Sequence, residues 1–292
     1  MSKIFEALRK TESELADVAK AVLSEGTAAG TAGALGGASA YSSDSATDSP
    51  EIQSGQNQNI RSVTINLESG SPILPFNGRG DRAAEQYRII RTKISHHPGQ
   101  PRIVLVSSPM PGDGKTISAI NLAAALSLQE NQRVLLLDCD FRRSSATKLL
   151  GLAAAPGLGE VLRDEANLEA ALVRINQFPN LYVLPPGITS PGPAELLASD
   201  RWQSFIDLCS SEFRFVVIDA PPIGAVAEYE LLQRACDGIV LVVRQDHTNR
   251  QLWRRALETV PKQKQLGVVL NCAREWFLWK THSYYYYSGK AQ

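Results

Sequence analysis

Long apolar runs, paired cysteines and a surplus of charge are all missing from this chain of 292 residues. No stretch reaches the roughly 18 apolar residues that span a bilayer, so we expect the chain not to cross a membrane. Thirty Lys and Arg residues balance thirty Asp and Glu residues, so no overall field attracts nucleic acid, and we expect no such partner. The four cysteines lack the spacing of a disulfide framework or metal site, which is typical of reduced thiols in the cytoplasm.

The beginning of the chain differs in composition from the rest. Residues 1–25 carry apolar side chains at helical spacing, which predicts a short amphipathic helix, either a frayed end or a docking helix. Residues 26–72 begin as a Gly-, Ala-, Ser- and Thr-rich stretch, which predicts a disordered linker. We expect a folded domain over residues 73–280 and a tyrosine-rich tail over residues 281–292.

Short runs of Val, Ile and Leu alternate with helical patterns after the linker. We expect strands at 102–107, 133–138, 181–184, 213–219, 238–243 and 266–270, and helices that include 116–129, 193–211 and 250–260. Continuous apolar strands separated by helices form parallel sheets that are covered on both faces. The sequence therefore predicts a doubly wound α/β fold of the P-loop NTPase type, with a mainly parallel sheet.

A strand, a glycine-bearing loop and a helix follow one another in the order that a phosphate-binding loop requires. Gly112 and Gly114 allow backbone N–H groups to turn toward phosphate oxygens at a helix N-terminus. Lys115 is expected to contact the phosphates of ATP, and the Thr116 hydroxyl to bind Mg²⁺. Pro109 stands where the strict motif has Gly, and an ordinary strand-to-helix turn is the alternative. The expected nucleotide-binding residues are Pro111, Gly112, Asp113, Gly114, Lys115, Thr116 and Ile117.

Carboxylates follow two of the predicted strands. Asp138 and Asp140 end one strand on the same side, and Asp219 ends another, just before two prolines. Paired carboxylates repel each other unless a cation or a proton lies between them. We therefore expect Thr116, Asp138, Asp140 and Asp219 to hold Mg²⁺, with helix capping as the alternative role for Asp219.

These segments resemble the bacterial tyrosine kinases (BY-kinases) of capsule and exopolysaccharide synthesis. The residues 108–116, 134–143 and 215–222 are similar to the family's Walker A, A′ and B segments. The resemblance implies that Lys115, Asp138, Asp140 and Arg142 are catalytic and that Asn271 lies near the adenine of ATP. Asp138 would orient or deprotonate the acceptor hydroxyl, and Arg142 would stabilise the transition state.

Two further segments carry the same resemblance. Glu85, Arg88 and Arg91 match the family's E-x-x-R-x-x-R oligomerisation motif, which implies a ring of identical subunits, whereas a solvated helix face is the alternative. Tyr284, Tyr285, Tyr286 and Tyr287 resemble its autophosphorylated cluster, with a sticky aromatic tail as the alternative. The resemblance implies phosphorylation in trans. Added phosphates would then repel the tail from an acidic site and loosen the ring.

Two other functions share much of this pattern. A ParA/MinD-type ATPase has a signature lysine where this chain has Met110, which favours the kinase. A non-catalytic protein whose assembly is controlled by nucleotide stays open. The resemblance also implies a separate transmembrane co-polymerase as activator, and so a cytoplasmic protein recruited to the inner face of the membrane.

Overall fold

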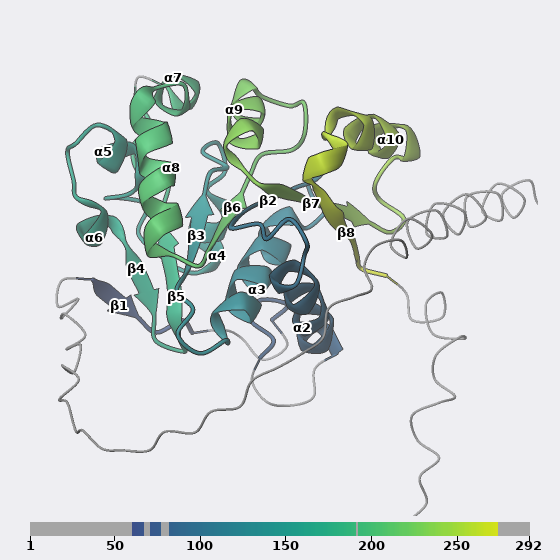
Figure 1. Ribbon diagram of the computed structural model, residues 1–292, viewed down its shortest axis with the longest axis horizontal. Helices are drawn as coiled ribbons and strands as arrows, with labels where there is room; N and C mark the ends of the chain where they lie inside the picture. Colours follow the sequence, from purple (N-terminus) through teal and green to yellow (C-terminus); the bar gives the residue numbers. More distant parts are fainter. Residues whose placement is uncertain (1–59, 67–70, 77–81, 191, 274–292) are drawn as a thin grey trace, which may run out of the picture. The chain divides into compact units, whose positions relative to one another are not determined.

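The computed structural model describes residues 60–66, 71–76, 82–190 and 192–273 (Figure 1). The expected N-terminal helix, most of the expected linker and the whole expected tail lie outside these residues. Within the described ranges, none of the helices is both long and apolar enough for a membrane span.

One sheet of eight strands forms the centre of the described structure (Figure 1). Its order is β1-β4-β5-β3-β6-β2-β7-β8. The strands are β1 Arg61–Val63, β2 Ile103–Ser107, β3 Val134–Asp138, β4 Val173–Ile175, β5 Phe178–Leu184, β6 Phe215–Asp219, β7 Gly238–Arg244 and β8 Gln265–Asn271. All pairs are parallel except β4 with β5. The predicted doubly wound, mainly parallel α/β fold is confirmed.

Helices cover both faces of the sheet. Every residue of the strands β2, β3 and β6 is therefore buried. One core cluster packs against α2 Arg82–Ser95, α3 Lys115–Ser127 and α4 Ser145–Leu149. The other packs against α5 Leu158–Leu162, α7 Pro193–Leu197, α8 Asp200–Glu212, α9 Ala227–Ala235 and α10 Arg250–Thr259. The short α6 Leu168–Ala171 and the 3-10 turn η1 Lys262–Lys264 complete the described elements.

The structure corrects two expectations. The single helix predicted over 193–211 is two helices, because the backbone of Ser199 is extended (ψ 155°) and its hydroxyl donates to the carbonyl of Leu196 at 2.7 Å. The predicted linker 26–72 ends too late, because residues 61–63 form the edge strand β1 beside β4. Ile65 is also buried, which supplies apolar burial that a linker would not have.

The sheet brings the carboxyl ends of three strands together on one side. The strands β3 and β6 are neighbours, and β6 is also the neighbour of β2, so all three parallel strands end at the same side. In open α/β sheets, ligands bind outside the carboxyl ends of the strands. The topology therefore places the phosphate loop after β2 beside the aspartates that end β3 and β6.

Candidate functional site

The loop between β2 and α3 has the backbone of a phosphate cradle. Gly112 and Gly114 have positive φ angles of 87° and 97°, a region that favours glycine. A Cβ at Gly114 would lie 2.0 Å from Nδ2 of Asn271, so a larger residue would displace that side chain in addition to straining the backbone. The helix α3 begins at Lys115, directly after the loop, with Gly114 as its N-cap. The free backbone N–H groups of this helix end can therefore face an anion.

Lys115 joins the loop to two strand ends. Its Nζ lies 2.6 Å from Oδ2 of Asp140 and 3.5 Å from Oδ1 of Asp219, and it donates to the Thr116 hydroxyl at 3.3 Å. Lys115, Asp140 and Asp219 are all buried. Three predicted site residues, Thr116, Asp140 and Asp219, thus contact the ammonium group of a fourth, Lys115.

Asp138 is buried at the end of β3 and is held by a residue that sequence reasoning missed. Its Oδ2 accepts hydrogen bonds from the backbone N–H and the hydroxyl of Thr147, at 2.9 and 2.7 Å. Its Oδ1 is buried without a partner, as is Oδ2 of Asp219. A buried carboxylate oxygen without a partner is costly unless water, a proton or a cation reaches it. These two oxygens fit a Mg²⁺ or hydroxyl site.

Burial and mutual repulsion perturb the titration of the cluster. Burial raises the pKa of Asp219 to about 7, although the nearby Lys115 ammonium acts to lower it. Burial also raises the pKa of Asp138, against the hydrogen bonds from Thr147. For Lys115, burial acts to lower the pKa, but the carboxylates of Asp219, Asp140 and Asp138 outweigh it and raise that pKa. The ammonium stays charged near neutral pH, while the raised pKa values of Asp138 and Asp219 make these two carboxylates easier to protonate.

The raised pKa of Asp219 predicts a pH-dependent stability. The proton on Asp219 stabilises the metal-free fold fully below the usual pKa of 3.8, and this contribution is lost as the pH rises toward about 7. We therefore expect the melting temperature of the wild type, relative to Asp219→Asn, to fall over this window by several degrees. Saturating Mg²⁺ should reduce the fall. Melting curves of the two proteins that stay parallel with pH would contradict the assignment.

Asp113, inside the loop, is fully buried and ties the loop to the segment after β7. Its Oδ1 accepts from the hydroxyl of Thr248 at 2.7 Å and lies 3.0 Å from Nδ1 of His247, while its Oδ2 accepts from the N–H of Met110 at 3.0 Å. Its carbonyl accepts from Nδ2 of Asn271 at 2.9 Å. Asp113 therefore acts as a support for the loop, and its predicted contact with nucleotide stays a prediction, as does the adenine contact of Asn271.

Removal of the Thr248 hydroxyl should loosen this support. In Thr248→Val the buried carboxylate of Asp113 loses its shortest hydrogen bond, which we expect to lower the free energy of unfolding by about 1–3 kcal/mol. Thr248→Ser should retain most of the stability. Thr259→Val on the exposed side of α10 is the matched control. Urea unfolding measures the effect, and equal stability of the Thr248 and Thr259 variants would refute it.

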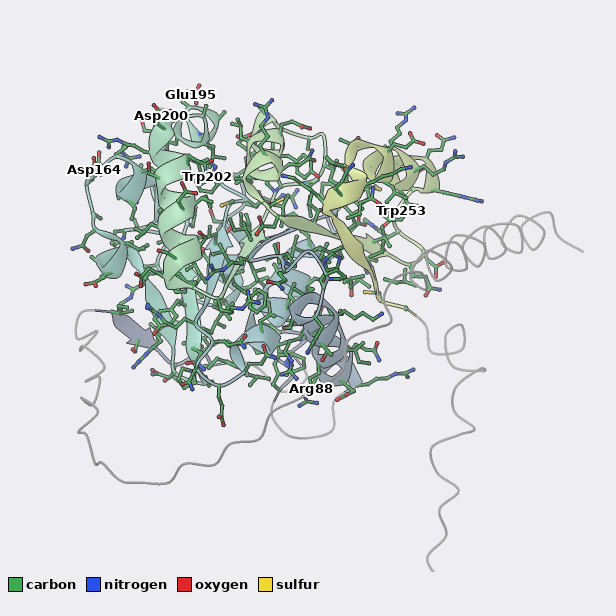
Figure 2. All side chains as sticks on the ribbon, viewed as in Figure 1. Arg88, Asp164, Glu195, Asp200, Trp202 and Trp253 are labelled. Carbon is green, nitrogen blue, oxygen red and sulfur yellow. The ribbon has the colours of Figure 1, made fainter. Side chains whose placement is uncertain are left out.

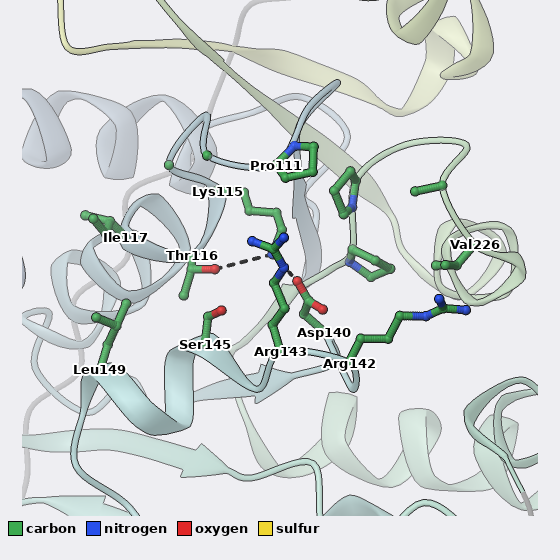
Figure 3. A pocket seen from close by; sticks show the side chains of 15 residues that line it. Pro111, Lys115, Thr116, Ile117, Asp140, Arg142, Arg143, Ser145, Leu149 and Val226 are labelled. Atoms are coloured by element: carbon green, nitrogen blue, oxygen red, sulfur yellow. Dashed lines mark hydrogen bonds and ion pairs between the residues drawn. The ribbon is translucent and has the colours of Figure 1, made fainter. Parts of the chain in front are cut away.

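A pocket of about 420 Å³ lies beside the cluster (Figure 3). Its wall includes six of the expected nucleotide-binding residues, namely Pro111, Gly112, Gly114, Lys115, Thr116 and Ile117, and also Asp140 and Arg142. Sequence reasoning did not select Arg143, Ser145, Leu149 or the apolar wall of Pro221, Pro222, Ala225 and Val226. Arg142 and Arg143 follow the Walker A′ aspartates in the sequence, but nothing in the sequence indicates in which direction each side chain points.

The expected oligomerisation residues lie on α2, away from the pocket lining. Glu85 and Arg88 form an exposed ion pair of 3.0 Å within the helix, and Arg88 lies at the surface in Figure 2. Arg91 instead donates to the carbonyl of Ala125 on α3 at 3.4 Å. Glu85 and Arg88 are thus available to a neighbour, whereas Arg91 is used within its own subunit. The expected acceptors Tyr284 to Tyr287 lie outside the described residues.

Comparisons with known proteins identify the family of this chain. A family model described as AAA domain matches residues 101–265. The tyrosine-protein kinase YwqD of Bacillus subtilis is 35% identical over 71% of this chain and 87% of that protein. The tyrosine-protein kinase wzc of Salmonella typhimurium is 33% identical over 60% of this chain, but the match spans only 24% of its length. The crystal structure of the chimerical protein CapA2B2 matches with a TM-score of 0.64 and 27% identity, over 71% of this chain and 91% of that one.

The match to YwqD covers most of both chains, and the fold and the loop geometry are those expected of a P-loop kinase. These findings favour the kinase over the ParA/MinD-type alternative. The chain therefore belongs to the bacterial tyrosine kinases, the BY-kinase family.

Proposed function

We propose that this chain uses MgATP to phosphorylate the tyrosines of its own tail, residues 284–287, in trans between subunits of a ring, and so regulates capsule or exopolysaccharide synthesis or export. The observation that carries the proposal is the convergence of Lys115, Asp140 and Asp219 at the carboxyl edge of the sheet. One ammonium group and two carboxylates buried together at a phosphate loop suit the binding of a metal-bound triphosphate better than a purely structural role.

The residues at this edge divide into two tasks. Thr116, Asp140 and Asp219 would hold Mg²⁺, which when bound neutralises charge on the phosphate oxygens. Lys115 would release Asp140 and bind the β- and γ-phosphates, since it is the first residue of α3 and a helix N-terminus favours an anion. Gly112 and Gly114 allow the backbone to approach the phosphates closely.

Asp138 is our candidate to accept the proton of the phenol. Its Oδ2 is anchored by Thr147, whereas its buried Oδ1 has no hydrogen-bond partner and could accept one from a hydroxyl that enters the site. The tyrosine oxygen forms a bond to the γ-phosphorus, the bond from that phosphorus to the bridging oxygen breaks, and ADP leaves. The phenol proton passes to Asp138, whose raised pKa brings it closer to the pKa of a tyrosine.

The family relationship also motivates the proposed partners and location. The relative wzc extends far beyond the part that matches this chain, and CapA2B2 is a chimerical protein. We propose that a separate transmembrane co-polymerase activates this chain at the inner face of the membrane. Glu85 and Arg88 would contact the next subunit of the ring, since both are exposed on α2.

Mass spectrometry of the full chain after incubation with ATP and Mg²⁺ tests the proposal. We expect phosphate on one or more of Tyr284 to Tyr287. A chain that binds nucleotide and assembles but carries no phosphotyrosine, even with excess ATP, would support the non-catalytic alternative instead. Omission of Mg²⁺ is the control, and it should abolish the modification.

A further inference from the structure

Arg142 and Arg143 are cations of the pocket wall that point in different directions. Both line the pocket and are exposed. In Figure 3 the Arg143 side chain projects over the Lys115–Asp140 pair, whereas the Arg142 side chain extends away from that pair toward Val226. Arg142 is therefore poorly placed to contact a phosphoryl group held by Lys115. The transition-state role expected for it from the sequence suits Arg143 better.

Nothing in the described part of the chain neutralises Arg142. Lys115 faces two buried carboxylates, but neither arginine guanidinium has a hydrogen bond or ion pair with another described residue. Beside Arg142, the wall is apolar and consists of Pro221, Pro222, Ala225 and Val226. An apolar surface of this kind can pack against an aromatic ring. An arginine beside it could then bind an anionic group that lies next to the ring in the same ligand.

The expected acceptor tail carries no such group until it has been modified. Residues 281–292 contain no Asp or Glu side chain. A phosphotyrosine adds about two negative charges, which an arginine can bind through two parallel hydrogen bonds. The four consecutive tyrosines place a first phosphate within one to three residues of every remaining acceptor.

We propose that Arg142 is a phosphate subsite for the acceptor chain, which binds a phosphotyrosine beside the tyrosine that is about to react. This inference rests on the proposed function and deepens it: the first phosphorylation of a tail favours the next. It also revises the expectation that phosphates are repelled by an acidic site. The pocket wall carries Lys115, Arg142 and Arg143 against the single carboxylate of Asp140. Each further phosphorylation consumes one ATP, transfers its γ-phosphoryl group to one tyrosine and releases one ADP.

Matched peptides of residues 281–292 test the inference. The primed peptide carries phosphotyrosine at position 285, and the unprimed peptide carries Tyr285→Phe, so that each offers three acceptor tyrosines. The enzyme is the full chain with Tyr284 to Tyr287 replaced by Phe, which prevents its own tail from competing. Label from ATP on each peptide gives the two values of kcat/KM. We expect the primed peptide to be preferred by about tenfold, mainly through a lower KM.

The substitution Arg142→Ala should remove this preference, and Arg142→Lys should retain part of it, because a lysine keeps the charge but not the bidentate geometry. Arg254→Ala, an exposed arginine of α10 outside the pocket lining, should keep the full preference. Equal kcat/KM values for the two peptides with the unsubstituted Arg142 would overturn the inference. A preference that survives Arg142→Ala would also overturn it. If the chain labels neither peptide nor its own natural tail, the proposed function fails instead.

Discussion

Replacing Lys115 with Met should reduce tail phosphorylation by about 10³-fold or more. In the proposed mechanism the ammonium neutralises the phosphates, and in the structure it is the partner of Asp140 at 2.6 Å and of Asp219 at 3.5 Å. A neutral side chain of similar length retains the packing but supplies no charge. Phosphotyrosine on the tail, quantified after incubation with MgATP, measures the loss. A Lys115→Met chain that labels its tail at the wild-type rate would end the proposed mechanism.

The same substitution should also destabilise the fold, because it leaves buried carboxylates without their cation. We expect Lys115→Met to lower the free energy of unfolding by up to about 3–5 kcal/mol. The double variant Lys115→Met/Asp219→Asn removes one of the unpaired carboxylates and should regain part of this stability. It should not regain activity. The comparison therefore separates a loss of catalysis from a loss of folding, and a double variant that recovers phosphorylation would contradict the role of Lys115.

Mixing two inactive variants should restore phosphorylation if transfer occurs between subunits. The Lys115→Met chain keeps its acceptor tyrosines, and the chain with Tyr284 to Tyr287 replaced by Phe keeps its phosphate loop. Each alone should give almost no tail label, whereas the mixture should label the tail of the Lys115→Met chain. Electrophoresis of differently sized variants identifies which chain carries the phosphate. Label that never exceeds the sum of the separate samples would exclude transfer in trans.

If the subunits form a ring, transfer between the two chains of this mixture should depend on the contact between subunits. Glu85→Ala together with Arg88→Ala, introduced into both chains, should lower the restored label and the mass measured by light scattering. These two residues test the surface better than Arg91 does, because Arg91 is bonded to the carbonyl of Ala125 in its own subunit. Unchanged assembly and unchanged label would remove α2 from the subunit contact.

The order of strand, glycine loop and helix was readable from the chain because it depends on local pattern. Val, Ile and Leu runs identify buried strands, and Gly112 and Gly114 mark a turn that larger residues do not adopt. The doubly wound α/β fold was predicted in this way, and the BY-kinase family from the resemblance of the motifs; both predictions are confirmed. The short strands β1 and β4 were missed, because three residues give too little periodicity to detect.

The partners of the site residues could not be found in the same way. Thr147 lies 9 residues after the carboxylate that it holds, and Thr248 lies 135 residues after Asp113. No spacing rule gives these contacts, because the first depends on the loop between β3 and α4, and the second on the parallel strands β2 and β7 being neighbours in the sheet. The different directions of the neighbouring Arg142 and Arg143 side chains (Figure 3) likewise follow from no pattern in the sequence.

Residue type and local order along the chain thus determined the phosphate loop, the strand-end aspartates and the type of fold, since each depends on backbone preferences and on hydrophobic burial of nearby residues. The packed fold alone decided which carboxylate meets Lys115, which one is held by Thr147, and which arginine projects over the Lys115–Asp140 pair (Figure 3). The physical reason is that burial and charge pairing depend on which segments the sheet brings together. The raised pKa of Asp219, about 7, is a property of that assembly and not of the segment that contains it.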